Sequence, residues 1–139
     1  MTGRCLCGTV RVTLTARPEF IHDCNCSLCR KSGGAWGYFP GAQVRTEGST
    51  NAFLRKDKTG AAAELQSCPT CATTTHWVFA AEFQDQNPDV DLVGVNMRLF
   101  DPEDLEGIEL RFPNGRDWSG QGAFGYRHAP VTLGKDVSL

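Results

Sequence analysis

The sequence predicts a mainly-β domain of short strands whose cysteines lie on the turns between them. Three observations favour this class. Short runs of β-branched and aromatic residues recur along the chain, bounded by glycine, proline and asparagine, as is typical of strands and turns. Apolar residues at helical spacing are nearly absent. The seven cysteines fall in three tight groups, and such groups supply the metal ligands that hold small domains together.

The length of the chain fits a single domain. It has 139 residues and a mass of 15.2 kDa, and we expect one zinc-binding domain over residues 1–139. Its 15 glycines and 7 prolines indicate many turns, and no internal repeat, linker or charge block divides it. Metal cross-links would help to fix such a loop-rich fold.

The expected strands are short and follow one another with little between them. The first runs from Thr9 to Thr15, where Val10, Val12 and Leu14 alternate with polar residues as in a half-buried strand. Turn signals separate it from the later candidates. These are Trp36–Phe39, Val44–Thr46, Ala52–Leu54, Ala63–Gln66, Thr74–Ala80, Leu92–Met97 and Glu109–Phe112.

Only two short helices are expected. One is Ser27–Ser32, which follows clustered cysteines, and the other is a single turn at Pro102–Leu105 that Asp101 would cap. The segment Gly120–Gly125 fits the pattern GxGxxG, but no convincing strand precedes it and no helix follows it. We therefore expect a flexible C-terminal loop there, and no dinucleotide site.

The charge of the chain excludes some partners. A net charge of -2 and a pI near 5.9 leave no basic face for phosphate contacts, so nucleic acid is not expected as a partner. No apolar run has the length of a signal peptide or reaches the roughly 20 residues of a membrane span. We expect a soluble cytoplasmic protein, for which a homo-oligomer is possible.

The cysteine spacing predicts metal sites. A reducing cytoplasm disfavours structural disulfides, and seven cysteines cannot all pair within one chain. The spacings CxC, CxCxxC and CxxC instead deliver several thiolates to one ion from short turns. We expect two zinc ions per chain, bound by Cys5, Cys7, Cys24, Cys26, Cys29, Cys68 and Cys71.

Four of these sulfurs form the expected structural site. Cys68 and Cys71 lie on a CxxC turn, and Cys5 and Cys7 complement them, with Gly8 allowing a sharp turn before the first strand. The alternative for the CxxC turn is a thioredoxin-like redox pair, which needs a helix after it. A β-rich run follows instead, so the closed four-thiolate site is the favoured interpretation.

The remaining three sulfurs form a different kind of site. Cys24, Cys26 and Cys29 can face one zinc ion and leave one tetrahedral position unfilled, as in catalytic sites. The alternative is a second closed structural site. Its fourth ligand would come from one of the candidates His22, Asp23, His76 and His128.

An open three-thiolate zinc suits thiol chemistry. Its net charge of about -1 makes it poor at activating water, but it can hold an incoming thiol as a nucleophilic thiolate. That sulfur could then attack a small electrophilic carbonyl. Arg30 and Lys31 follow the last ligand directly, and either lie in solvent or hold the carboxylates of a peptide-like thiol.

The segments GRCLCGTV, CNCSLCRKSGGAW and CPTCATTTHW together resemble the glutathione-dependent formaldehyde-activating enzyme family, which includes centromere-protein-V-like proteins. The resemblance covers residues 3–80, and the later segments 95–99 and 115–118 are similar to the centromere-protein-V-like branch. It implies an Mss4-like fold of short antiparallel strands, a structural zinc and a catalytic zinc on the two cysteine sets above. The implied reaction is that of a carbon-sulfur lyase, which joins glutathione to formaldehyde as S-hydroxymethylglutathione.

Two residues depart from the family pattern. Asn25 stands where many members carry His, and the loss of an imidazole could remove a proton carrier or a partner of the metal ligands. Ala72 stands where Gly is usual, and we expect it to fit with a negative φ. The alternative to an enzyme is therefore a zinc-stabilised β module that binds a partner protein or a small thiol.

Overall fold

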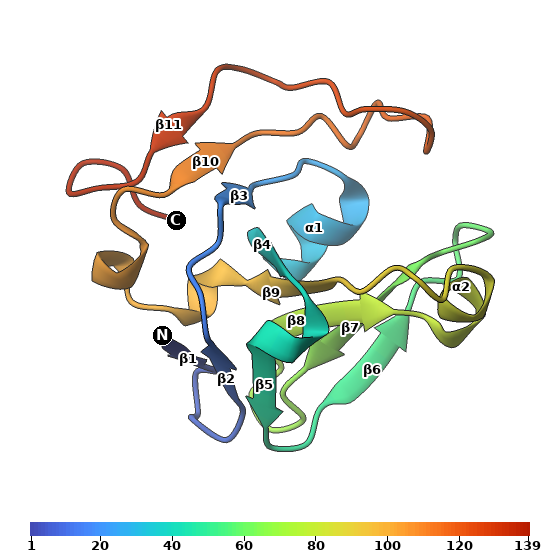
Figure 1. Cartoon of the computed structure of the whole chain (residues 1–139), viewed down its shortest axis with the longest axis horizontal. Helices are drawn as coiled ribbons and strands as arrows, with labels where there is room; N and C mark the ends of the chain where they lie inside the picture. Colours follow the sequence, from blue (N-terminus) through green and yellow to red (C-terminus); the bar gives the residue numbers. More distant parts are fainter.

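The computed structural model describes residues 1–139 and is mainly β, as predicted (Figure 1). The helices are α1 (Ser27–Ser32) and α2 (Ala81–Gln86), with 3-10 helices at Gly41–Gln43, Met97–Leu99 and Pro102–Leu105. The strands are β1 (Thr2–Arg4), β2 (Arg11–Leu14), β3 (Phe20–His22), β4 (Trp36–Phe39), β5 (Val44–Glu47), β6 (Asn51–Leu54), β7 (Ala63–Ser67), β8 (Thr74–Phe79), β9 (Val93–Asn96), β10 (Glu109–Arg111) and β11 (Val131–Thr132). No helix combines the length and hydropathy needed to cross a bilayer.

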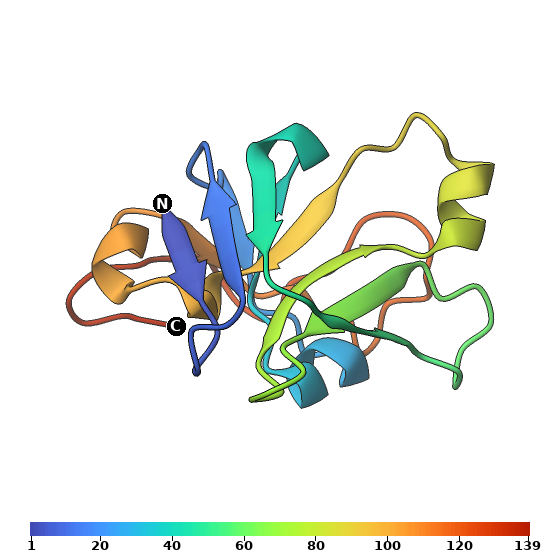
Figure 2. The ribbon, with the colours of Figure 1, turned by 90° about the horizontal axis from the view of Figure 1, so that it is seen from below.

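The strands form two sheets. β1, β2 and β5 make a three-stranded sheet, and the other eight follow the order β11-β10-β3-β4-β9-β8-β7-β6. All strand pairs are antiparallel except β3 with β10, which are parallel. Both views place the two chain termini on the side opposite α2 (Figures 1 and 2). The connection between β3 and β4 contains α1, and it therefore carries residues 24–29 away from the sheet.

The helix prediction at Ser27–Ser32 is confirmed, and the turn at Pro102–Leu105 is also present. Asp101 occupies the predicted cap position, but its side chain makes no hydrogen bond to that turn. The sequence reasoning missed β1, β3, β11 and α2. Three of these are strands of two or three residues, too short to show a period, and α2 has no buried face and no side-chain cap.

The hydrophobic core lies between the two sheets and the segments around β9 and β10. Its 13 buried residues are Val12, Leu14, Ile21, Ala35, Phe39, Val95, Met97, Leu99, Phe100, Leu105, Ile108, Leu110 and Leu133. A separate small cluster contains Cys5, Val10 and Cys68. Most of the large aromatic side chains of β4 and β8 remain outside this core, and this leaves them available to line a cavity.

Candidate metal centres

Four cysteines from two distant turns meet at one point. Cys5 and Cys7 lie between β1 and β2, and Cys68 and Cys71 lie between β7 and β8. Their sulfurs lie within 4.8 Å of one another, with 3.5 Å between Cys5 and Cys7 and 3.6 Å between Cys7 and Cys68. A zinc tetrahedron with Zn–S bonds of about 2.3 Å places its sulfurs about 3.8 Å apart. The four-sulfur cluster therefore fits a metal ion, and all its thiols are free.

Neighbouring hydroxyl groups favour the thiolate form of two of the four sulfurs, Cys7 and Cys71, whereas the pKa of Cys68 is raised. The hydroxyl of Thr73 lies 3.2 Å from the Cys71 sulfur and lowers the pKa of that thiol to about 5. The hydroxyl of Thr9 likewise lowers the pKa of Cys7. The backbone N–H of Val10 donates to the Cys5 sulfur at 3.2 Å. Gly8 has a φ of +76°, which confirms the sharp turn expected before the first strand.

Ala72 differs from its expected conformation. Its φ is +60°, in the left-handed region, and the prediction of a negative φ was wrong. The Ala72 N–H donates to the Cys68 carbonyl at 2.9 Å, so the CxxC turn imposes this conformation. The left-handed region costs a residue with a Cβ about 1 kcal/mol or more, which explains why Gly would suit the position.

The other three cysteines form a cluster within a single segment. Cys24, Cys26 and Cys29 lie in the connection from β3 to β4, and their sulfurs all lie within 4.8 Å of one another. The sulfurs of Cys26 and Cys29 are 3.3 Å apart, and all three thiols are free. Cys26 caps α1, because its sulfur accepts from the Cys29 N–H at 3.5 Å. The three-sulfur cluster can also hold a metal ion.

No histidine or carboxylate completes the three-sulfur cluster. None of the four alternative fourth ligands has a ligand atom within 4.8 Å of all three sulfurs, and each makes a contact elsewhere, although the Nε2 atom of His22 has no hydrogen-bond partner. The ring of His22 bonds the Tyr38 hydroxyl at 3.0 Å, and that of His76 bonds the Thr75 hydroxyl at 3.0 Å. The carboxylate of Asp23 lies 3.7 Å from each of two arginines, and the ring of His128 lies 3.9 Å from that of Phe112. The cluster is therefore open on its fourth side.

The three sulfurs share their protons unequally. Hydrogen bonds from the Cys24 and Cys29 thiols, and from backbone N–H groups of α1, lower the pKa of Cys26 to about 2. The same contacts raise the pKa of Cys24 and of Cys29, which keep their protons. The indole N–H of Trp36 donates to the Cys29 sulfur at 3.2 Å. A bound metal ion would replace the remaining protons, because metal ligation requires thiolates.

An apolar cavity of about 280 Å³ adjoins the three-sulfur cluster. We call it the aromatic chamber. Its walls come from distant parts of the chain, and its aromatic members are Trp36, Tyr38, Trp77, Trp118 and Phe124. His22 also lines it, and the Nε2 atom of His22 is buried without a hydrogen-bond partner. Burial lowers the pKa of His22 to about 4, so its ring is neutral near pH 7.

Residues 113–124, which we call the C-terminal segment, close one side of this chamber. A Cβ at Gly115 would lie 2.4 Å from the Cys24 sulfur, so only glycine allows the chain to pass there. Asn25 holds this segment, because its amide donates to the Asn114 side chain at 2.7 Å and accepts from the Arg116 N–H at 2.9 Å. The sequence reasoning missed this role. The sequence did offer one indication of it, because Asn25 lies between two cysteines and an asparagine amide readily forms hydrogen bonds with backbone groups.

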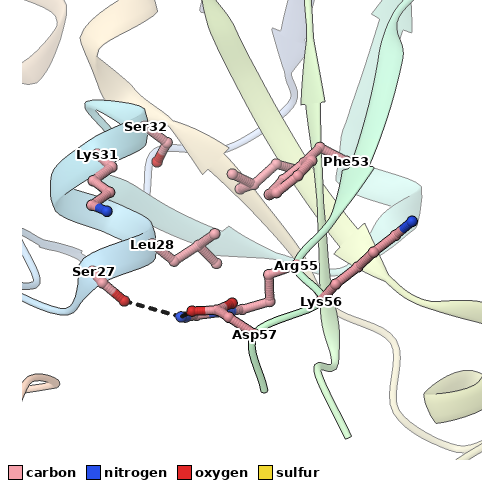
Figure 3. A pocket seen from close by; sticks show the side chains of 9 residues that line it. Ser27, Leu28, Lys31, Ser32, Phe53, Arg55, Lys56 and Asp57 are labelled. Carbon is pink, nitrogen blue, oxygen red and sulfur yellow. Dashed lines mark hydrogen bonds and ion pairs between the residues drawn. The ribbon is translucent and has the colours of Figure 1, made fainter. Parts of the chain in front are cut away.

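A second cavity of about 600 Å³ lies between α1 and the strands β6 and β7 (Figure 3). We call it the basic groove. Lys31 lies on one side, with Arg55 and Lys56 on the other, and Asp57 is its single carboxylate. Arg55 donates to Ser27 at 3.0 Å and makes two bonds to Asp57, which raise the pKa of the guanidinium. The groove therefore carries a net positive charge.

The basic groove and the aromatic chamber share three wall residues, Leu28, Arg55 and Leu65. The two cavities are therefore neighbours, and the three-sulfur cluster lies at the chamber end. Arg30 lies in a separate small cleft with Asp23, Arg98 and Arg127, which Cys24 and Cys29 also line. Although Arg30 and Lys31 are adjacent in sequence, the structure directs them to different sites.

The fold and the two clusters define a β protein with two cysteine sites that fit metal ions. The family model described as glutathione-dependent formaldehyde-activating enzyme matches residues 1–107, and the chain belongs to this family. The fold is similar to that of a Rhodobacter sphaeroides protein of known crystal structure, with a TM-score of 0.56 and 24% identity over 78% of this chain and 97% of that chain. No curated protein matches.

Proposed function

We propose that the protein is a zinc-dependent enzyme of the carbon-sulfur lyase type. It would add a low-molecular-weight thiol, glutathione, to formaldehyde or another small aldehyde. The observation that carries the proposal is the three-sulfur cluster, which has no fourth protein ligand and opens onto a cavity. Membership of the family supports the same chemistry. A cytoplasmic location fits seven free thiols, because a reducing compartment keeps them reduced.

Two zinc ions would have different roles. The four-sulfur cluster would hold a structural ion, since its ligands leave no position for a substrate. Cys24, Cys26 and Cys29 would hold the catalytic ion, which supplies a binding position for a thiol and lowers the pKa of that thiol. The Trp36 N–H, which bonds the Cys29 sulfur, would stabilise negative charge on that ligand.

The basic groove suits the peptide part of glutathione. Glutathione carries two carboxylates, and Lys31, Arg55 and Lys56 offer cations in a groove that shares wall residues with the chamber. Arg55 is the best placed, because its side chain is only 13% exposed and lies on the wall between groove and chamber. We propose Lys31 and Arg55 as carboxylate partners, while Arg30 would influence the site through its charge alone.

The proposed reaction is a balanced addition. The thiol sulfur bonds to the carbonyl carbon, the π electrons of the carbonyl move to its oxygen, and the proton lost by the thiol ends on that oxygen. No oxidant or reductant is required. The chain would contribute by aligning the two reactants and by excluding water from the chamber.

A metal-substitution experiment tests the proposal. The protein is loaded with Co²⁺, and glutathione is titrated while the visible absorption is recorded. We expect a change in the cobalt bands that saturates at one glutathione per chain and that is absent from Cys26→Ser. Formation of S-hydroxymethylglutathione, followed by NMR, should exceed the uncatalysed rate. Unchanged cobalt bands and an unaccelerated rate would instead favour the non-enzymatic zinc-stabilised module.

A further inference from the structure

We propose that the carbonyl substrate is larger than formaldehyde and carries an apolar, aromatic group that fills the aromatic chamber. This inference rests on the proposed thiol addition and narrows its substrate class. It is carried by the size, the lining and the position of the chamber relative to the three sulfurs.

The chamber is too large for formaldehyde alone. Its volume is about 280 Å³, whereas a water molecule takes about 30 Å³ in the liquid. Formaldehyde has only two non-hydrogen atoms and would leave most of the chamber filled with water. Cavities approaching the volume of this chamber usually bind organic molecules with many atoms. The size therefore favours a carbonyl compound with a substantial side group.

The lining excludes the charged ends of glutathione from the chamber. Apart from the three cysteines of the cluster, ten of its 18 lining residues are hydrophobic, and its cations are Arg55 and Lys58. Arg55 belongs also to the basic groove, so one of these charges lies on the shared wall. A carboxylate placed among the indole and phenyl rings, away from these two cations, would lose its hydration without gaining a partner. The peptide would therefore occupy the groove, and an apolar group would occupy the chamber.

The aromatic walls reach the three-sulfur cluster. Trp36 touches the cluster directly through the bond from its indole to Cys29. Tyr38 and Trp77 meet edge to face at 6.2 Å, and Trp118 lies 4.5 Å from Phe124. Rings from two strands and from the C-terminal segment thus surround one space. A flat apolar group attached to the carbonyl carbon would contact these rings while its carbon lies beside the sulfurs.

A pair of stable conjugates tests this directly. S-benzylglutathione differs from the adduct of glutathione with benzaldehyde only by a hydroxyl group, and S-methylglutathione differs likewise from the formaldehyde adduct. The Kd of each is measured on the zinc-loaded protein by isothermal titration calorimetry. We expect S-benzylglutathione to bind about tenfold more tightly or better. Equal affinities, or tighter binding of the methyl compound, would overturn the inference.

Variants of the chamber wall test whether the preference for S-benzylglutathione over S-methylglutathione arises in the chamber. Trp118 is 36% exposed on a C-terminal loop, so Trp118→Ala should fold and should reduce the tenfold preference to threefold or less, with Trp118→Phe restoring most of it. Val90→Ala, at an exposed site outside both cavities, should leave the preference unchanged. A preference that Trp118→Ala leaves intact would contradict binding in the chamber.

Turnover separates this inference from the proposed function. Benzaldehyde and formaldehyde are compared as substrates with glutathione, and we expect benzaldehyde to have the higher kcat/KM. Efficient turnover of formaldehyde with none of benzaldehyde would overturn the inference and leave the proposed function intact. Preferential binding of S-benzylglutathione without turnover of any aldehyde would overturn the proposed function while supporting the assignment of the chamber.

Discussion

The two cysteine clusters use the same ligand type in opposite ways. The four-sulfur cluster joins turns that are about 61 residues apart in sequence, and two of its cysteines are buried. The three-sulfur cluster comes from six consecutive residues, is half-buried and faces a cavity. A cluster that joins distant segments resists unfolding, whereas a cluster within one segment adds little to the fold and can keep a free position. The following predictions test this contrast, from the largest expected effect to the smallest.

The largest effect is expected for Cys68→Ser. Cys68 is 1% exposed and anchors the connection between two hairpins, so its loss should remove the metal that joins them. Structural zinc binding supplies about 10–16 kcal/mol in zinc-finger peptides, comparable to the whole stability of a domain. We expect no cooperative thermal unfolding by circular dichroism. A melting curve like that of the wild type would show that the two clusters do not differ in this way.

Cys26→Ser should affect activity and leave the fold intact. The variant loses a ligand of the three-sulfur cluster and the cap of α1, but no connection between distant strands. We expect one metal ion per chain in place of two. Turnover should fall about 100-fold or more, because the loss of a metal ligand should cost more than the loss of a hydrogen-bond partner of a ligand. Metal analysis and kinetics measure both. Unfolding as severe as that of Cys68→Ser would assign a structural role to both clusters.

Gly115→Ala should disturb the three-sulfur cluster alone. The added Cβ would lie 2.4 Å from the Cys24 sulfur, so the C-terminal segment must move away. We expect the ion of this cluster to be released to a chelator about tenfold faster, with the other ion unaffected. Gly125→Ala is the matched control, because nothing lies within 4 Å of its Cβ position. Identical release from both variants would argue against a covering role for this segment.

The smallest effect is expected for Ala72→Gly at the four-sulfur cluster. Glycine adopts a φ of +60° without strain, so the variant should gain about 0.5–1 kcal/mol in the free energy of unfolding. Ala42→Gly is the control, since the exposed Ala42 has no positive φ and should lose a similar amount. Denaturant unfolding measures both. A loss of stability in Ala72→Gly would show that the turn does not strain alanine.

The two clusters also differ in how far sequence reasoning could reach. Spacing alone grouped Cys5, Cys7, Cys68 and Cys71, because CxC and CxxC turns each present two sulfurs to one ion. The same reasoning placed α1 correctly at Ser27–Ser32. It considered Asn25 only as the loss of a proton carrier or of a partner of the metal ligands, and it did not foresee that the Asn25 amide holds the C-terminal segment against the three-sulfur cluster. A contact across 89 residues leaves no mark in local spacing.

The sequence by itself determined the fold class, the family and the two sets of sulfurs, because these depend on local patterns of residue type and spacing. The tertiary structure decided the surroundings of the open cluster. It separated Lys31 from Arg30, brought Arg55 to the groove, and placed Trp118 and Phe124 in the wall of the cavity that the three sulfurs also line. These arrangements depend on how strands far apart in the chain pair and pack. No short pattern of residues encodes them.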